Sequence, residues 1–420
     1  PMKKCIAMSV AVLTLGTGTA HAEPYQATLL AALPEFNGSL REGVALYGSV
    51  DMGINYQTVG GKSLVQTQSG GEWTSKFGIF GREDLGGGLK TVFQLENGFD
   101  INTGKLGQGN KMFGRQAYVG LTGDQWGTFT LGRQYDSVVD YVGPLEAGDQ
   151  WGGYIAAHPG DIDNFNNAYR TNNTVKYTSA NYGGLTFGGT YSFGGQAGNI
   201  TGNQIWSLGA GYNNGPLVLG VGYLNARTPA ASGGLFNNGG TISPNTFATA
   251  TAPANFAVTS PVYGAYASAN TYQVVGAGGA YTFGAATIGL TYSNIRFANL
   301  GTTFAQPGVR GQSATFNNAE LNFKYQLTPA LLVGAAYDYT RGASIQNAST
   351  AQYHQGAVGV DYFLSKRTDV YVTGVYQHAL GQVLNQSGTG VVDATAGING
   401  LSGSSNQNQF TARVGIRHKF

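Results

Sequence analysis

Apolar and polar residues alternate with a period of two at the end of the chain. From Phe410 to Phe420 nearly every second residue is apolar, and Arg413, Arg417 and Lys419 lie between them. This pattern predicts a β-strand with one apolar and one cationic face. Such a strand is typical of an outer-membrane β-barrel, where one face meets lipid and the other meets water. An amphipathic edge strand of a soluble β-sandwich would show the same short pattern.

The alternation recurs from Val44 onward, for example with Leu46 and Val50 opposite Tyr47 and Asp51. Short turns separate many of these segments. Turns that carry Gly, Asn or Pro are predicted at 84–88, 123–127, 181–184, 213–216, 283–286 and 327–330, and a further short turn is predicted at 365–367. Longer polar connections lie between the turns, the longest being 135–170, 227–270 and 380–408. Short turns at one rim and long loops at the other favour a barrel over a sandwich.

The fold class that follows is all-β, a transmembrane antiparallel β-barrel. Its seven short turns imply about sixteen strands, and a barrel of that size encloses water because side chains cannot fill it. Charged residues make up 10% of the chain, against roughly 25% in soluble domains. Strands that are apolar on one face only produce such a composition. No apolar run after the first 22 residues reaches the ~18 residues of a membrane helix.

The first residues predict export. Lys3 and Lys4 precede an apolar run, and Ala20 and Ala22 form a small-residue cleavage site, so residues 1–22 are read as a signal peptide. Residues 23–42 would then be an N-terminal extension and residues 43–420 the barrel. The single cysteine, Cys5, falls in the leader, so the mature barrel would have no disulfide. The balance of 23 cations and 21 acids gives no basic field for nucleic acid.

Several motifs resemble one family. They are Leu46-Tyr47-Gly48-Ser49-Val50-Asp51, the segments 76–90 and 93–99, Gly114-Arg115-Gln116-Ala117-Tyr118, the segment 131–136, and the ending 415–420. These segments resemble the general trimeric porins of Gram-negative bacteria, in the branch typical of β-proteobacteria. The extension 23–42 departs from that family, whose mature chains enter the first strand almost at once.

The resemblance implies a homotrimer in the outer membrane, surrounded by lipid and lipopolysaccharide, with three separate pores. Ions and small hydrophilic solutes would diffuse passively through each pore. The third loop would fold into the lumen and constrict it, with its acids facing basic residues on the wall. No cofactor and no metal are implied, and no enzyme motif such as G-x-S-x-G or H-E-x-x-H is present.

The candidate acids of the constriction lie in the third loop, taken as 135–173. The bend from Pro144 to Asp149 resembles the acidic bend of the family, so Glu146 and Asp149 are placed in the constriction, with Asp140 beside them. The alternative for each acid is a solvated position on the loop surface.

The candidate cations must face the lumen, because Lys or Arg toward lipid costs roughly 2–4 kcal/mol at the midplane. Alternation directs Lys76 and Arg170 inward, while Arg115 is assigned to the pore by the resemblance. Arg133 shares the side of Phe129 and Leu131, so the pattern predicts the outer face for it. Three further charged residues are secondary candidates for the lumen, namely Arg82, Glu96 and Asp51. Of these, Arg82 is expected near the periplasmic rim.

Charges in a wide pore interact weakly. Two unit charges ~10 Å apart interact by about 0.4 kcal/mol at a dielectric constant of 80 and ~1.7 kcal/mol at 20. A several-fold ion preference follows, whose sign the sequence leaves open. A substrate-selective channel for anionic metabolites is the main alternative, and an adhesin with a blocked lumen is the third. The low-complexity segments 233–268 and 388–409 are expected to be mobile external loops.

Overall fold

The computed structural model describes residues 42–231, 234–237, 260–303, 305–342, 345–346, 349–385 and 387–420. The predicted signal peptide and almost all of the extension 23–42 lie outside these ranges, as do residues 238–259. Among the described residues, no helix has the length and apolar character needed to cross a membrane.

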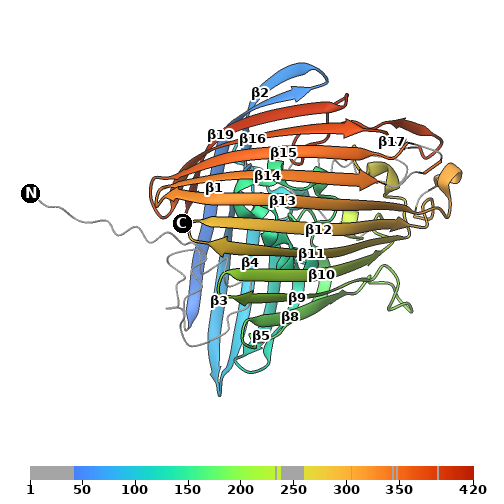
Figure 1. Cartoon of the computed structure of the whole chain (residues 1–420). Coiled ribbons are helices and arrows are strands. Elements are labelled where there is room, and N and C mark those ends of the chain that lie inside the picture. Colours follow the sequence, from blue (N-terminus) through green and yellow to red (C-terminus); the bar gives the residue numbers. More distant parts are fainter. Residues whose placement is uncertain are drawn as a thin grey trace, which may run out of the picture.

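Sixteen antiparallel strands of the described chain form one closed wall (Figure 1). They are β1 (Gly43–Val59), β3 (Lys76–Gly86), β4 (Leu89–Gly98), β5 (Gln116–Gly123), β6 (Gly127–Gln134), β7 (Thr171–Thr178), β8 (Leu185–Ser192), β9 (Ile205–Asn214), β10 (Leu217–Arg227), β11 (Thr271–Phe283), β12 (Ala286–Ala298), β13 (Ala314–Thr328), β14 (Leu331–Gly342), β15 (Gln352–Phe363), β16 (Thr368–Leu380) and β19 (Asn408–Lys419). The predicted all-β barrel of about sixteen strands is confirmed.

The wall closes where the first and last strands meet. β1 pairs with β19 from Ser49↔Lys419 to Gln57↔Thr411. The lower part of β1 pairs with β3, and its upper part forms a protruding hairpin with β2 (Lys62–Ser69). A separate two-stranded ladder, β17 (Gln382–Leu384) with β18 (Val391–Asp393), lies in the last loop.

Side-chain exposure follows the predicted alternation. Leu46 is 62% exposed on the outer face, whereas its neighbour Tyr47 is 2% exposed on the inner face. All seven predicted short turns join consecutive wall strands. The turn from β3 to β4 consists of Gly86, Gly87 and Gly88, whose φ angles of +63° to +87° are unfavourable for residues with a side chain.

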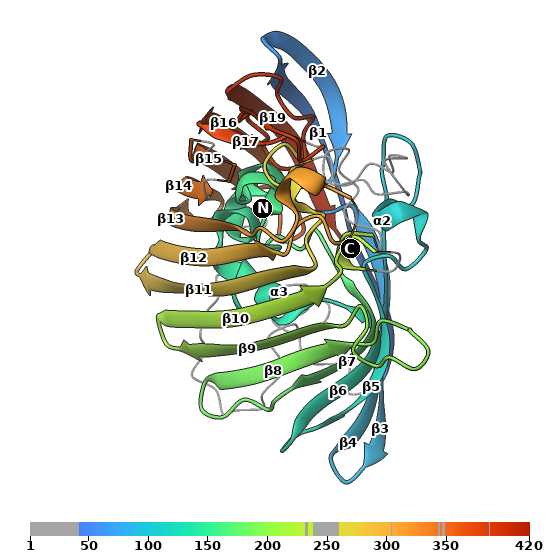
Figure 2. The same cartoon turned by 90° about the vertical axis from the view of Figure 1, so that its right-hand side faces the viewer.

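Loop 3, residues 135–170, folds into the barrel and contains short helical segments instead of strands (Figure 2). These are α3 (Ser137–Tyr141), η1 (Gly143–Leu145), the π-turn η2 (Gly148–Gly152), η3 (Tyr154–Ala156) and η4 (Pro159–Asp161). The remaining short helices lie in other loops and are α2 (Gly107–Asn110), η5 (Leu235–Asn237), η6 (Gly264–Tyr266) and η7 (Pro307–Val309). The predicted folding of the third loop into the lumen is confirmed.

Inward-facing glycines let loop 3 lie directly on the wall. A Cβ atom at Gly220 of β10 would come 1.9 Å from the carbonyl oxygen of Tyr141, and one at Gly222 would come 3.0 Å from the Cα of Val138. No real Cβ approaches backbone atoms as closely as 1.9 Å, so α3 requires glycine at position 220.

Gly220→Ala is therefore expected to displace α3 and to change the single-channel conductance of the protein in planar bilayers. Overpacking of this kind typically costs about 1–3 kcal/mol, so the barrel should still fold. Gly356→Ala is the control, because nothing lies within 4 Å of a Cβ atom there. Equal conductance of both variants and the unmodified protein would contradict this packing of loop 3.

The described parts of two loops expected to be mobile are packed in the external mouth. Tyr263 and Tyr266 from the connection between β10 and β11 contact Phe297 and Phe316 of the wall. In the last loop, the amide of Gly397 donates to Gln377 Oε1 (2.6 Å). The aromatic and aliphatic residues of these parts are buried against the inner wall, which the low complexity of the two segments did not indicate. Residues 238–259 lie outside the described chain.

Candidate functional site

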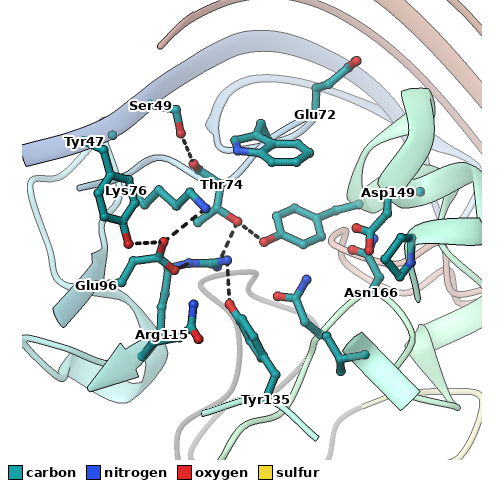
Figure 3. Close-up of a pocket in the computed structure, with 18 of the residues that line it drawn as sticks. Tyr47, Ser49, Glu72, Thr74, Lys76, Glu96, Arg115, Tyr135, Asp149 and Asn166 are labelled. Carbon is teal, nitrogen blue, oxygen red and sulfur yellow. Dashed lines mark hydrogen bonds and ion pairs between the residues drawn. The ribbon is translucent and has the colours of Figure 1, made fainter. Parts of the chain in front are cut away.

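A cavity of about 220 Å³ separates loop 3 from the wall formed by β1, β3, β4 and the start of β5. The wall contributes Lys76, Glu96 and Arg115, and loop 3 contributes Asp149 (Figure 3). Asp140 of loop 3 also lines the cavity. Because alternation turns these wall positions inward, both signs of charge meet across a narrow aqueous space.

Glu96 organises the wall side of the cavity. Its carboxylate lies 3.2 Å from Lys76 Nζ and 2.7 Å from Arg115 Nε, and it accepts a hydrogen bond from the Tyr47 hydroxyl (2.9 Å). Arg115 also donates to the hydroxyl of Tyr135 (2.8 Å) at the start of loop 3 (Figure 3). One carboxylate thus neutralises part of the charge of two cations and fixes their positions.

Loop 3 forms the opposite side. Asp136 caps α3 by accepting the amide hydrogen of Val138 (2.9 Å), which fixes the helix that carries Asp140. Asp140 forms an ion pair with Lys176 of β7. Asp149, on η2, accepts a hydrogen bond from Asn166 Nδ2 (2.8 Å). Asp149 has no ion pair among the described residues, and its carboxyl group lines the cavity.

An aromatic platform completes the cavity. The ring of Trp73 lies 5.6 Å from Lys76 Nζ, 5.9 Å from the Arg417 guanidinium carbon and 5.9 Å from Lys419 Nζ. Trp73 has the same parity as Phe77 and Ile79 in the sequence, which would direct it outward, yet it lines the cavity. The strand starts only at Lys76, because the amides of Glu72 and Trp73 donate to Asp51 Oδ2 and do not join the ladder.

Glu146 does not lie in the cavity, contrary to expectation. It is completely buried on the far side of the bend, 3.6 Å from His158 Nδ1. The next residue, Ala147, donates its amide hydrogen to Glu320 of β13 (2.9 Å). This bond holds the bend against the wall and turns the Glu146 carboxylate away from the pore.

Two arginines also occupy unexpected positions. Arg170 is buried behind the ring of Tyr135 (5.1 Å) and does not line the cavity, because β7 begins one residue later. Arg133, expected on the outer face, is 8% exposed and donates to the carbonyl of Gly114 (2.7 Å). A β-bulge between Gly132 and Gln134 shifts the register, which reverses the face of the residue.

The three secondary candidates, Glu96, Asp51 and Arg82, lie in three different places. Glu96 lies at the centre of the site. Asp51 lies behind it, completely buried and paired with Arg413 (3.0 Å), where it positions the segment that carries Trp73. Arg82 lies near the β3–β4 turn, 5.9 Å from the ring of Phe80 and outside the cavity.

Several cavity residues were not among the candidates. Tyr135 and Tyr154 lie in loop 3, where no periodicity assigns a direction to a side chain. Lys419 could have been found, because alternation placed it on the cationic face of the last strand.

Burial and nearby acids shift the charge of the site. Burial, with a smaller contribution from Asp161, raises the pKa of Asp149 to about 8, although Arg115 and Lys76 oppose the change. Burial also raises the pKa of Glu72 well above its usual range, against the attraction of Arg417. Near neutral pH Asp149 is therefore largely protonated, and the raised pKa of Glu72 acts in the same direction by reducing the negative charge of the cavity.

Ion preference should consequently depend on pH. Below about pH 8 Asp149 is neutral and anions are favoured, and above it the added negative charge favours cations. We expect the anion-to-cation permeability ratio to fall roughly two- to several-fold between pH 6 and pH 9.5. Reversal potentials in a KCl gradient measure this ratio. Asp149→Asn should reduce the dependence, whereas the exposed-site control Asp393→Asn should keep it.

The chain is similar to known proteins over much of its length. A family model described as Gram-negative porin matches residues 9–382. An outer membrane porin protein of Bordetella pertussis is 35% identical over 239 residues, covering 49% of this chain and 61% of that protein. Outer membrane porin protein 32 of Delftia acidovorans is 32% identical over 208 residues, covering 46% of this chain and 56% of that protein. The chain thus spans little more than half the length of these curated relatives.

Solved structures share the architecture. The anion-selective porin from Comamonas acidovorans superimposes with a TM-score of 0.65 at 22% identity, covering 90% of this chain and all of that one. OmpT of Vibrio cholerae gives a TM-score of 0.59 at 16% identity, covering 90% of this chain and 97% of that one. At these identities the likeness concerns the fold.

Proposed function

The chain belongs to the Gram-negative porin family, as its motifs predicted, and we propose that its barrel is a channel for general diffusion. The barrel lies in the outer membrane. Ions and small hydrophilic solutes would cross it passively, filtered by size and weakly by charge at the cavity beside loop 3. The proposal includes no chemical reaction and no cofactor.

One observation supports this proposal above the others. The cavity lies between loop 3 and the wall and carries Lys76 and Arg115 on one side and the acids Asp140 and Asp149 on the other, of which Asp149 ionises above about pH 8. Opposed charges across a narrow aqueous space orient dipolar solutes and bias ions, without the closed set of ligands that tight binding needs.

A substrate-selective channel for anionic metabolites is the second candidate. The three cations around Trp73 favour it, since they offer a positive surface beside an aromatic ring. One structural neighbour is described as an anion-selective porin. An adhesin with a blocked lumen is not favoured by a cavity lined with charged groups.

Conductance of the purified protein in planar bilayers tests the proposal. A general channel should give open steps that rise in proportion to salt concentration, and small anionic organic solutes should not saturate it. Saturation or block by such solutes at low concentration would favour the selective channel. Absence of conductance would contradict both.

Assembly and export belong to the same proposal. By resemblance to the family, the protein would be a homotrimer embedded in lipid and lipopolysaccharide, and residues 1–22 would be removed during export. The mass of the detergent-solubilised complex and N-terminal sequencing of protein from outer membranes test these two points.

A further inference from the structure

A cluster of buried acids surrounds one histidine on the far side of loop 3. Glu146, His158 and Asp163 come from the loop, and Glu320 and Asp338 come from β13 and β14. Each of the five residues is at most 2% exposed. The cluster lies outside the set of residues that line the cavity.

Three donor atoms converge within this cluster. His158 Nδ1 lies 2.7 Å from Asp163 Oδ2 and 3.6 Å from Glu146 Oε2. One ligand atom from each of the three residues falls within 4.8 Å of the others. The other ring nitrogen, Nε2, lies 3.2 Å from Thr291 Oγ1. A neutral imidazole that donates from Nε2 to Thr291 would direct the lone pair of Nδ1 toward the two carboxylates.

The Glu146 carboxylate lacks the partners that its burial demands. The residue is 0% exposed, yet neither Oε1 nor Oε2 has a hydrogen-bond partner in the described structure. Glu320 Oε2 is likewise buried without a hydrogen-bond partner in the described structure. His158 is the only cationic partner of these carboxylates among the ion pairs of the described chain. Buried carboxylates with so little positive charge need protons or a bound cation.

We propose that Glu146, His158 and Asp163 bind a divalent transition-metal ion of the Zn²⁺ type. An imidazole nitrogen with carboxylate oxygens is a donor set that suits Zn²⁺, whereas Ca²⁺ and Mg²⁺ prefer oxygen ligands alone. Surrounding groups already orient the ligands: Ser293 Oγ donates to Asp163 Oδ2 (2.6 Å), and Thr291 Oγ1 lies within hydrogen-bond distance of His158 Nε2 (3.2 Å).

Such a site would tie two distant parts of loop 3 together. Glu146 follows η1, while His158 and Asp163 flank η4, and Ser293 and Thr291 belong to β12. A metal ion bound to the three ligands would join the bend to the later part of the loop, beside the wall. It would thereby fix the side of loop 3 opposite to the pore.

The test uses the whole protein in detergent, freed of lipopolysaccharide so that no lipid phosphate binds metal. After treatment with a chelator and dialysis against ZnCl₂, we expect about one zinc ion per chain by elemental analysis. Co²⁺ in place of Zn²⁺ should give visible d–d absorption of a low-symmetry site. Zinc content no higher than that of a buffer blank would overturn the proposal.

Matched variants locate the metal. His158→Gln should remove most of the bound zinc and the Co²⁺ absorption. The control is His378→Gln, because His354 and His378 are cross-strand neighbours outside the cluster and offer another imidazole pair. Zinc lost in His378→Gln but kept in His158→Gln would overturn the assignment. If His158→Gln fails to fold, Asp163→Asn must show the same loss in protein with an unchanged far-ultraviolet spectrum.

Discussion

Replacing Arg413 by methionine is expected to lower the free energy of unfolding of the barrel by about 3–5 kcal/mol. Arg413 is completely buried and donates to Asp51 (3.0 Å), to the Tyr371 hydroxyl (2.7 Å) and to Asn55 (2.9 Å). Its loss leaves the Asp51 carboxylate buried without its cation. The effect is large because a buried charge without a partner costs more than the ion pair contributes.

Urea unfolding in detergent, followed by tryptophan fluorescence, measures the change. Arg310→Met is the control, since Arg310 is an exposed cation of an external loop. The double variant Arg413→Met with Asp51→Asn removes both charges and should regain part of the lost stability. Equal stability of Arg413→Met and Arg310→Met would show that this buried ion pair is not needed by the barrel.

Replacing Lys76 and Arg115 together by methionine is expected to reverse the ion preference toward cations. The two cations are held by one carboxylate, so their loss leaves the negative charge of Glu96 facing the cavity. Each charge removed about 10 Å from a passing ion changes its energy by ~0.4–1.7 kcal/mol, which corresponds to roughly two- to twentyfold in relative permeability.

Reversal potentials in a KCl gradient at pH 7 measure this preference. A triple variant that adds Glu96→Gln separates charge from shape, because it has the same altered wall without the carboxylate. It should return most of the way to weak selectivity. If the double and triple variants have the same reversal potential, the charges of this wall do not control ion passage.

The wall could be predicted from the sequence because lipid on one side and water on the other impose a period of two. The difference in exposure between Leu46 (62%) and its neighbour Tyr47 (2%) results directly from this period. The inward direction of Lys76 followed from the same constraint, which a lipid-facing lysine would violate. Gly, Asn or Pro marked the positions of six of the seven turns.

The prediction failed where periodicity ends. The predicted outer face of Arg133 was wrong because a β-bulge shifts the register there, and the sequence pattern does not reveal the bulge. Glu146 and Arg170 lie in or at the end of loop 3, where backbone bonds to Glu320 and packing on Tyr135 decide the directions of side chains. These contacts join residues far apart in the chain, so local spacing does not specify them.

The ladder between β1 and β19 has a consequence for how the protein is made. Every other pair of neighbours in the wall comes from strands that follow one another along the chain, apart from the β2 hairpin. Those hairpins join residues that are close in the sequence, whereas the pairing of Ser49 with Lys419 joins residues at opposite ends of the barrel segment. Loss of the final strand would leave two unpaired edges within the bilayer, where no water can satisfy their amides. Closure of the wall thus depends on β19, and because this pairing has the largest sequence separation it should be a slow step.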